Sequence, residues 1–113
     1  MEKTKIGKEV FEMQAQVCKT LANPTRLMIL HTLRDGEKSV GELAAILDLR
    51  QANLSQHLTI MRQTQILKTR KQGSNIYYSL SCPIINNACD MVRDVLIQLL
   101  DRKQHLSNSL SKP

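Results

Sequence analysis

The sequence predicts a mainly α-helical protein with one β-hairpin, in the order four helices, hairpin, helix. Apolar residues recur every three or four positions over most of the chain, which is the helical period. Between residues 66 and 80 this period gives way to two short runs of β-branched and aromatic residues around a Gly-Ser pair, which predicts a hairpin. With no tryptophan, one phenylalanine and two tyrosines, the core must come from aliphatic side chains, which suits packed helices.

The first two helices are predicted by an apolar stripe and a capping signal. Residues 8–22 place Phe11, Ala15, Cys18 and Ala22 on one helical face. Asn23 followed by Pro24 is typical of an N-cap and a first helical position. The second helix therefore starts at Pro24 and is expected to end before Gly36.

The third and fourth helices are short and close together. Ser39 followed by Glu42 has capping-box spacing and predicts a helix that ends near Asp48. Another helix is expected to begin around Gln51. Its apolar face is formed by Leu54, Leu58 and Met61.

The remaining chain predicts the hairpin and a long last helix. ILKTRKQ and NIYYSL are the two strands, joined by Gly73-Ser74. Cys82-Pro83 again has the pattern of a cap followed by proline, and the last helix is expected over about residues 83–104. We predict one domain over residues 1–105 and a frayed or disordered tail over residues 106–113.

Two short helices joined by a three- or four-residue turn predict a helix-turn-helix, and a hairpin directly after them makes it a winged helix-turn-helix. Small Ala44 would let the second helix cross closely, and Leu54 and Leu58 would anchor it. The expected core residues of the helix after Ser39 and of the turn that follows it are Val40, Leu43, Leu47 and Leu49.

Charge is concentrated in one part of the chain. The formal net charge is +6, yet no Asp or Glu occurs between Asp48 and Asp90. That interval holds five basic residues, Arg50, Arg62, Lys68, Arg70 and Lys71. Such a surface indicates a polyanionic partner, either nucleic acid or an anionic membrane, although a merely solvated face is the alternative.

The polar face of the fourth helix has the chemistry to read DNA. Gln and Asn can bond adenine through two hydrogen bonds, and Ser can bond several base edges. The candidate base-reading residues are Gln51, Asn53, Ser55 and Gln56. The candidates for phosphate contacts are Arg50, Arg62, Arg70 and Lys71, with Ser74 and Asn75 at the wing tip. An ordinary amphipathic helix is the competing interpretation.

Three motifs resemble those of the ArsR/SmtB family of transcription repressors. They lie in LANPTRLMIL, in the SQHL of the fourth helix and in RKQGSNIYYSL, and the resemblance covers about residues 10–100. It implies a homodimer through the first and last helices, a palindromic DNA operator, and release by an inducer. Asp48 departs from the glycine usual in the family's turn, but aspartate tolerates the left-handed conformation better than most residues.

His57 lies in the SQHL motif of the fourth helix. A metal ligand on a helix needs a partner four residues away, and the residues there are Asn53 and Met61. We therefore interpret His57 as a residue on the DNA side that bonds a phosphate or a neighbouring backbone group.

The metal sites known in the family are missing from this sequence. Its Cys-x-Cys site would fall on Ser39-Val40-Gly41, which contains no thiol. The site on the last helix would fall on Cys82, Ile84, Val95 and Gln98, of which only the cysteine binds metals firmly. Asp90 with Asp94, and Asp101 with His105, have the spacing for an ion, although such pairs are usually solvated.

The three cysteines are the remaining candidates for a sensor. Cys18 and Cys89 lie on the helices that pack together in the family, so they could meet and bind As(III) or Sb(III), or form a disulfide or polysulfide. They could equally be buried hydrophobic residues. Cys82, beside Pro83, is expected to be the most exposed of the three.

Other functions find less support. No Cys-x-x-Cys, glycine-rich phosphate loop or Ser/His/Asp set indicates an enzyme. No signal peptide or long apolar segment is seen, so we expect a cytoplasmic protein with no membrane partner. An architectural DNA-binding protein without a metal or thiol inducer remains the alternative to an inducible repressor.

Overall fold

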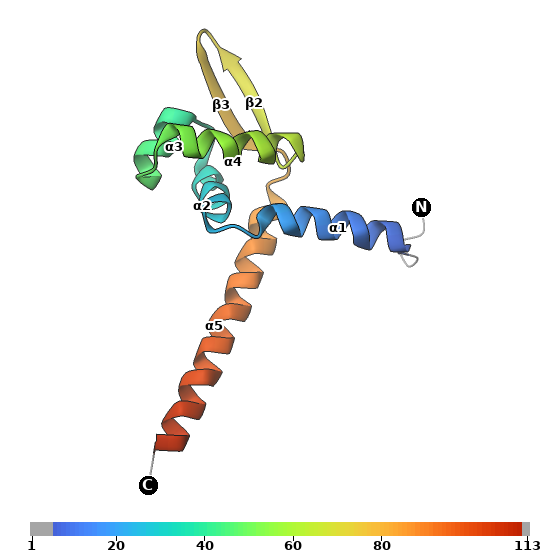
Figure 1. Ribbon diagram of the computed structural model, residues 1–113, viewed down its shortest axis with the longest axis vertical. Helices are drawn as coiled ribbons and strands as arrows, with labels where there is room; N and C mark the ends of the chain where they lie inside the picture. Colours follow the sequence, from blue (N-terminus) through green and yellow to red (C-terminus); the bar gives the residue numbers. More distant parts are fainter. Residues whose placement is uncertain (1–5, 112–113) are drawn as a thin grey trace. The chain divides into compact units, whose positions relative to one another are not determined.

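The computed structural model describes residues 6–111, without the side chains of residues 107 and 109–111. Its contacts divide the chain into two compact units, residues 1–82 and residues 83–113. The first unit contains four helices and a small sheet, and the second is one long helix (Figure 1). The single domain over residues 1–105 stays a prediction.

The first unit has the element order that the sequence predicts, and the mainly α fold with a hairpin is confirmed. Its helices are α1 (Lys8–Leu21), α2 (Pro24–Thr32), α3 (Val40–Leu47) and α4 (Gln51–Gln63), with a 3₁₀ turn at Leu33–Asp35. Its strands are β1 (Lys38–Ser39), β2 (Leu67–Gln72) and β3 (Asn75–Leu80).

Two of the three predicted helix caps are present, at Asn23 and Ser39. The cap predicted at Cys82-Pro83 is wrong, because α5 begins at Ile84 and Pro83 is not its first residue. The side chain of Asn23 accepts hydrogen bonds from the backbone N–H groups of Thr25, at 2.9 Å, and Arg26, at 3.2 Å. Ser39 accepts from the N–H of Glu42 at 3.1 Å, and the Glu42 carboxylate accepts from the N–H of Ser39 at 3.0 Å. These bonds satisfy N–H groups that a helix start leaves without a partner.

Two helices end on residues in the left-handed conformation. Asp48 has φ 54° after α3, as the sequence predicts, and Gln65 has φ 65° after α4. In each case the next N–H reaches back five residues, from Leu49 to Ala44 and from Ile66 to Met61. This is a Schellman arrangement, which turns the chain sharply. At Gln65 it directs the chain from α4 into β2, a turn that was not predicted from the sequence.

The sheet has one strand more than predicted. Its order is β1-β3-β2, all antiparallel. The hairpin pairs Leu67 with Leu80 at its base and Gln72 with Asn75 at its tip, where Gly73 has φ 62°. Strand β1 covers only Lys38–Ser39, too short to show an alternating pattern in the sequence.

The core lies under α4, which packs against α2, α3 and β2. Its fully buried side chains are Ile29, Leu30, Leu43, Leu54, Leu58 and Met61. The predicted anchors of α4 are thus confirmed, whereas Val40, Leu47 and Leu49 are only half-buried. Complete burial of each anchor stabilises the fold by roughly 1.5–3 kcal/mol, so α4 is held firmly along one face.

The second unit is α5, Ile84–Ser111. It ends beyond residue 104 and includes residues 106–111, which we had predicted to be frayed or disordered; residues 112–113 lie outside the described residues. One reason is the spacing of Leu99 and Leu106, which continues the apolar helical face past residue 104. None of the helices in the described residues is long and apolar enough to cross a membrane.

Candidate nucleic-acid interface

The exposed face of α4 carries the predicted base-reading residues together. The side chains of Gln51, Asn53, Ser55 and Gln56 are all exposed. They lie in the first half of the helix, and the buried residues Leu54, Leu58 and Met61 hold that helix against the core. The result is a set of exposed amide and hydroxyl groups around the start of a rigid helix, which suits hydrogen bonding to base edges.

The N-terminus of α4 is open to an anion. Arg50 occupies the N-cap position with no hydrogen bond from its side chain to the helix, and the first turn contains no acid. The free N–H groups of a first turn and the helix dipole favour a negative ligand. Arg62 is exposed in the last turn, so basic groups stand near both ends of the helix.

His57 is directed toward α2. It is half-buried, and its Nδ1 accepts a hydrogen bond from Nε of Arg26 on α2 at 3.2 Å. Burial and, to a lesser extent, the charge of Arg26 lower the pKa of His57 below its usual value of 6.5. The partner of Nδ1 is thus a side chain and not a backbone group. A phosphate contact through Nε2 stays a prediction.

Arg26 connects three helices and was not identified as a site residue from the sequence. Besides its bond to His57 on α4, it donates from Nη1 to the carbonyl oxygen of Thr20 near the end of α1, at 3.0 Å. Its position within the LANPTRL motif was the one available signal. A contact between residues 31 positions apart gives no periodic pattern that could have revealed it.

Arg70 on β2 has a protein partner rather than a free charge. Its Nε donates to both carboxylate oxygens of Glu37 at 3.1 Å, and its Nη2 donates to Oε1 of the same group. Its guanidinium also lies 4.9 Å from the ring centroid of Tyr77. The hydrogen bond from Arg70 lowers the pKa of Glu37, and the same bond raises the pKa of Arg70. Folding therefore brings the acid Glu37 beside Arg70, although no acid lies near Arg70 in the sequence.

The other predicted wing residues are exposed at the hairpin tip. They are Lys71, Ser74 and Asn75. Because side chains alternate along a strand, Lys71 points to the face of the hairpin opposite to Arg70. The side chains of Arg70 and Lys71 therefore lie on opposite faces of the hairpin.

The cysteines are distributed over both units. Cys18 is exposed on α1, Cys82 is exposed before α5, and Cys89 is half-buried on α5; none forms a disulfide. Cys82 is exposed as expected, but so is Cys18, and its rank as the most exposed of the three stays a prediction. Within a single chain Cys18 is not a buried hydrophobic residue. The pairing of Cys18 with Cys89 stays a prediction.

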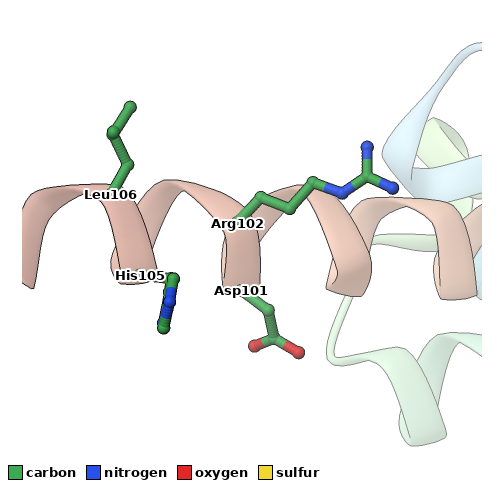
Figure 2. A pocket seen from close by; sticks show the side chains of 4 residues that line it. All are labelled: Asp101, Arg102, His105 and Leu106. Atoms are coloured by element: carbon green, nitrogen blue, oxygen red, sulfur yellow. The ribbon is translucent and has the colours of Figure 1, made fainter. Parts of the chain in front are cut away.

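The acidic pairs on α5 have ordinary helix-surface geometry. Asp90 accepts a hydrogen bond from Arg93 at 3.0 Å. Asp101, Arg102, His105 and Leu106 line a hollow, but Figure 2 shows Asp101 and His105 on one side of the helix and Arg102 and Leu106 on the other. Among the residues that the structure describes, no three His, Cys, Asp or Glu side chains gather where they could hold a metal ion.

A polar helix on a helix pair, followed by a hairpin, defines a winged helix-turn-helix protein. Residues 23–69 match the protein family described as "Bacterial regulatory protein, arsR family". The "Uncharacterized HTH-type transcriptional regulator Rv0081" of Mycobacterium tuberculosis is 35% identical over 92 residues, which are 80% of this chain and 81% of that protein. Its crystal structure superposes with a TM-score of 0.75 at 33% identity, covering 86% of this chain and 98% of the other.

Two further relatives are similar. The "Biofilm growth-associated repressor" of Agrobacterium fabrum is 51% identical over 67 residues, 59% of this chain; the match spans only 57% of that repressor's length. The "Transcriptional activator HlyU" of Vibrio cholerae is 39% identical over 80 residues, which are 71% of this chain and 74% of that protein. A structure of reduced HlyU is also similar, with a TM-score of 0.70 at 34% identity. That match covers 78% of this chain and 93% of the other. The chain belongs to the ArsR family. These relatives are named as transcriptional regulators and not as enzymes.

Proposed function

We propose that this chain is a sequence-specific DNA-binding repressor that acts as a homodimer on a palindromic operator. The observation that carries the proposal is the exposed, acid-free face of α4, held in place by three fully buried anchors. In this role Gln51, Asn53, Ser55 and Gln56 read base edges in the major groove. Arg50 and Arg62 contact phosphates on either side. Binding to DNA implies a cytoplasmic location.

Exposed apolar faces on α1 and α5 support the homodimer. On α1, Val10 is 51% exposed and Phe11 56%; on α5, Met91 is 68% exposed and Val92 69%. Several large apolar side chains exposed on one helix usually mark an interface. A second copy of the same chain offers matching faces, and a two-fold dimer would present two copies of α4 to the two halves of a palindrome.

Selection of duplexes from a random-sequence library by the purified protein tests the proposal. We expect an enriched palindrome, bound by a dimer, with affinity that falls steeply as salt rises. Equal affinity for the enriched and a scrambled duplex would favour the architectural alternative. A protein that retains no duplex contradicts DNA binding altogether.

For the inducer, the proposal is a thiol switch that uses Cys18 and Cys89. The exposure of Cys18 on the proposed dimer face supports it, as does the existence of a similar regulator in a reduced form. Two thiols that meet at this interface would bind As(III) or Sb(III) without a change of oxidation state. With an oxidant they would lose two electrons and two protons and form a disulfide, or, where a persulfide also donates a sulfur atom, a polysulfide bridge. Either event would change the angle between the two copies of α4. The alternative is a regulator with no metal or thiol inducer.

A further inference from the structure

Arg70 joins the two edges of the wing sheet. The register places Arg70 of β2 opposite Tyr77 of the central strand, and Tyr77 opposite Ser39 of β1. Glu37 lies two residues before Ser39, on the same side of the sheet by alternation. The guanidinium therefore passes over the Tyr77 ring, 4.9 Å from its centroid, and reaches the carboxylate beyond.

The donors of Arg70 are largely occupied in this arrangement. Nε bonds both oxygens of Glu37 at 3.1 Å, Nη2 bonds Oε1, and Nη1 donates to Oε1 of Gln72 at 2.8 Å. A phosphate could take this fork only if the carboxylate lost its partner. Lys71, on the opposite face of the hairpin, is exposed and has no resolved ion pair among the described residues.

The same contact ties the wing to the helix-turn-helix. Glu37 lies directly before β1, and Ser39, the last residue of β1, is also the N-cap of α3. Leu67 and Leu80 hold the base of the hairpin in the core, whereas its outer residues from Lys68 to Ser79 are exposed or half-buried. Besides the Glu37 contact, the hairpin is held by the pairing of its own strands, by the two residue pairs of β3 with β1, and by packing of β3 against α3 and the 3₁₀ turn at Leu33–Asp35.

We propose that Glu37, Tyr77 and Arg70 form a clasp that positions the wing on DNA, and that Lys71, not Arg70, is the phosphate contact of the wing. This inference rests on the DNA-binding function proposed above. Arg70 and Glu37 are positioning residues in this role. An acid is thus needed for DNA binding, although its charge alone would repel the phosphates.

For the variant Glu37→Gln, the loss of charge repulsion and the loss of wing positioning predict opposite changes in DNA affinity. Electrostatics alone predicts tighter DNA binding when the acid is removed. The clasp predicts binding about fivefold weaker to the enriched duplex, because a loosened wing occupies the competent orientation for only part of the time. Arg70→Gln should weaken binding to a similar extent, and the double variant should be no worse than either single one.

The salt dependence separates positioning from phosphate contact. Lys71→Gln, the matched control on the same strand, should weaken binding to enriched and scrambled duplexes alike and reduce the salt slope by about 1. Arg70→Gln should leave the slope as in wild type. In the absence of DNA, ¹⁵N relaxation of the amides of residues 71–75 should report larger amplitudes in Glu37→Gln than in wild type.

Tighter or equal binding by Glu37→Gln, a reduced slope for Arg70→Gln, or unchanged relaxation would each overturn the positioning role. A wild-type protein that binds no duplex would instead overturn the proposed function, and the positioning role with it. The relaxation measurement, made without DNA, still shows in that case whether the clasp restrains the hairpin. Both side chains are partly exposed, 49% for Arg70 and 38% for Glu37, so the variants are expected to fold.

Discussion

Arg26 on α2 and His57 on α4 are joined by a hydrogen bond of 3.2 Å, from Nε of the guanidinium to Nδ1 of the imidazole. The same guanidinium bonds the carbonyl oxygen of Thr20 at the end of α1. The helix proposed to read DNA is therefore connected through one side chain to the helix proposed to form the dimer. An acceptor at Nδ1 requires a neutral imidazole that carries its proton on Nε2.

Arg26→Ala should lower the free energy of unfolding by roughly 1–2 kcal/mol, because the carbonyl of Thr20 and Nδ1 of His57 both lose a donor. The fall is measured by urea denaturation. Arg26→Lys is the matched control for charge, and it should not restore stability, since one ammonium group lacks the two separate donors. Full stability in Arg26→Lys would mean that charge alone matters at this position.

The stability of the protein should depend on pH through His57. The folded protein holds the proton of His57 less tightly than the unfolded chain, since burial lowers its pKa. The stability associated with the neutral ring is therefore complete above pH 6.5 and is lost as pH falls through the lower pKa of the folded state. Thermal unfolding between pH 7.5 and 5 should show this fall, and His57→Gln should reduce it. His31→Gln, which leaves His57 in place, should not.

Gln51→Ala or Asn53→Ala should each weaken binding to the enriched duplex by roughly 1–3 kcal/mol and relax its sequence preference. Binding to a scrambled duplex should change little, because phosphate contacts remain. Gln63→Ala removes the same side chain as Gln51→Ala from the far end of the same helix and should have a small effect. If Gln63→Ala and Gln51→Ala behave alike in a fluorescence-anisotropy titration, the first half of α4 is not the base-reading surface.

Asp48→Gly should raise the free energy of unfolding by about 0.5–1 kcal/mol. Asp48 has φ 54° and ψ 52°, and glycine adopts this conformation without a Cβ clash, although it costs more backbone entropy. Asp48→Val, which is β-branched, should be destabilising in the same denaturation measurement. A gain in Asp48→Val would show that the turn is not strained.

Cys18→Ser and Cys89→Ser should leave DNA binding by the untreated protein intact. Unlike wild type, each variant should keep binding DNA after treatment with an oxidant such as diamide, or with arsenite. Both changes replace a sulfur with an oxygen of similar shape and remove one member of the proposed pair. Cys82→Ser is the control and should respond like wild type. If all three variants respond like wild type in the same titration, the thiol switch is wrong.

Most of the fold could be predicted because its signals are local. Asn23-Pro24, the Ser39 and Glu42 pair, and the Gly73-Ser74 turn each act within a few residues, and each was found where predicted. The end of α5 was placed too early, because polar serines and asparagines obscured a continuing apolar face. Strand β1 was missed because two residues show no period.

The amino-acid sequence by itself determined the winged helix-turn-helix, the anchors of α4 and the polar residues of its first half, since helical periodicity separates buried from exposed side chains. Only the tertiary structure decided the partners of His57 and Arg70, because those contacts join residues 31 and 33 positions apart. Sequence spacing reports which residues share a helix or a strand. It does not report which charge on another element will neutralise a cation, and that pairing separates Arg70 from Lys71 although the two are neighbours in the chain.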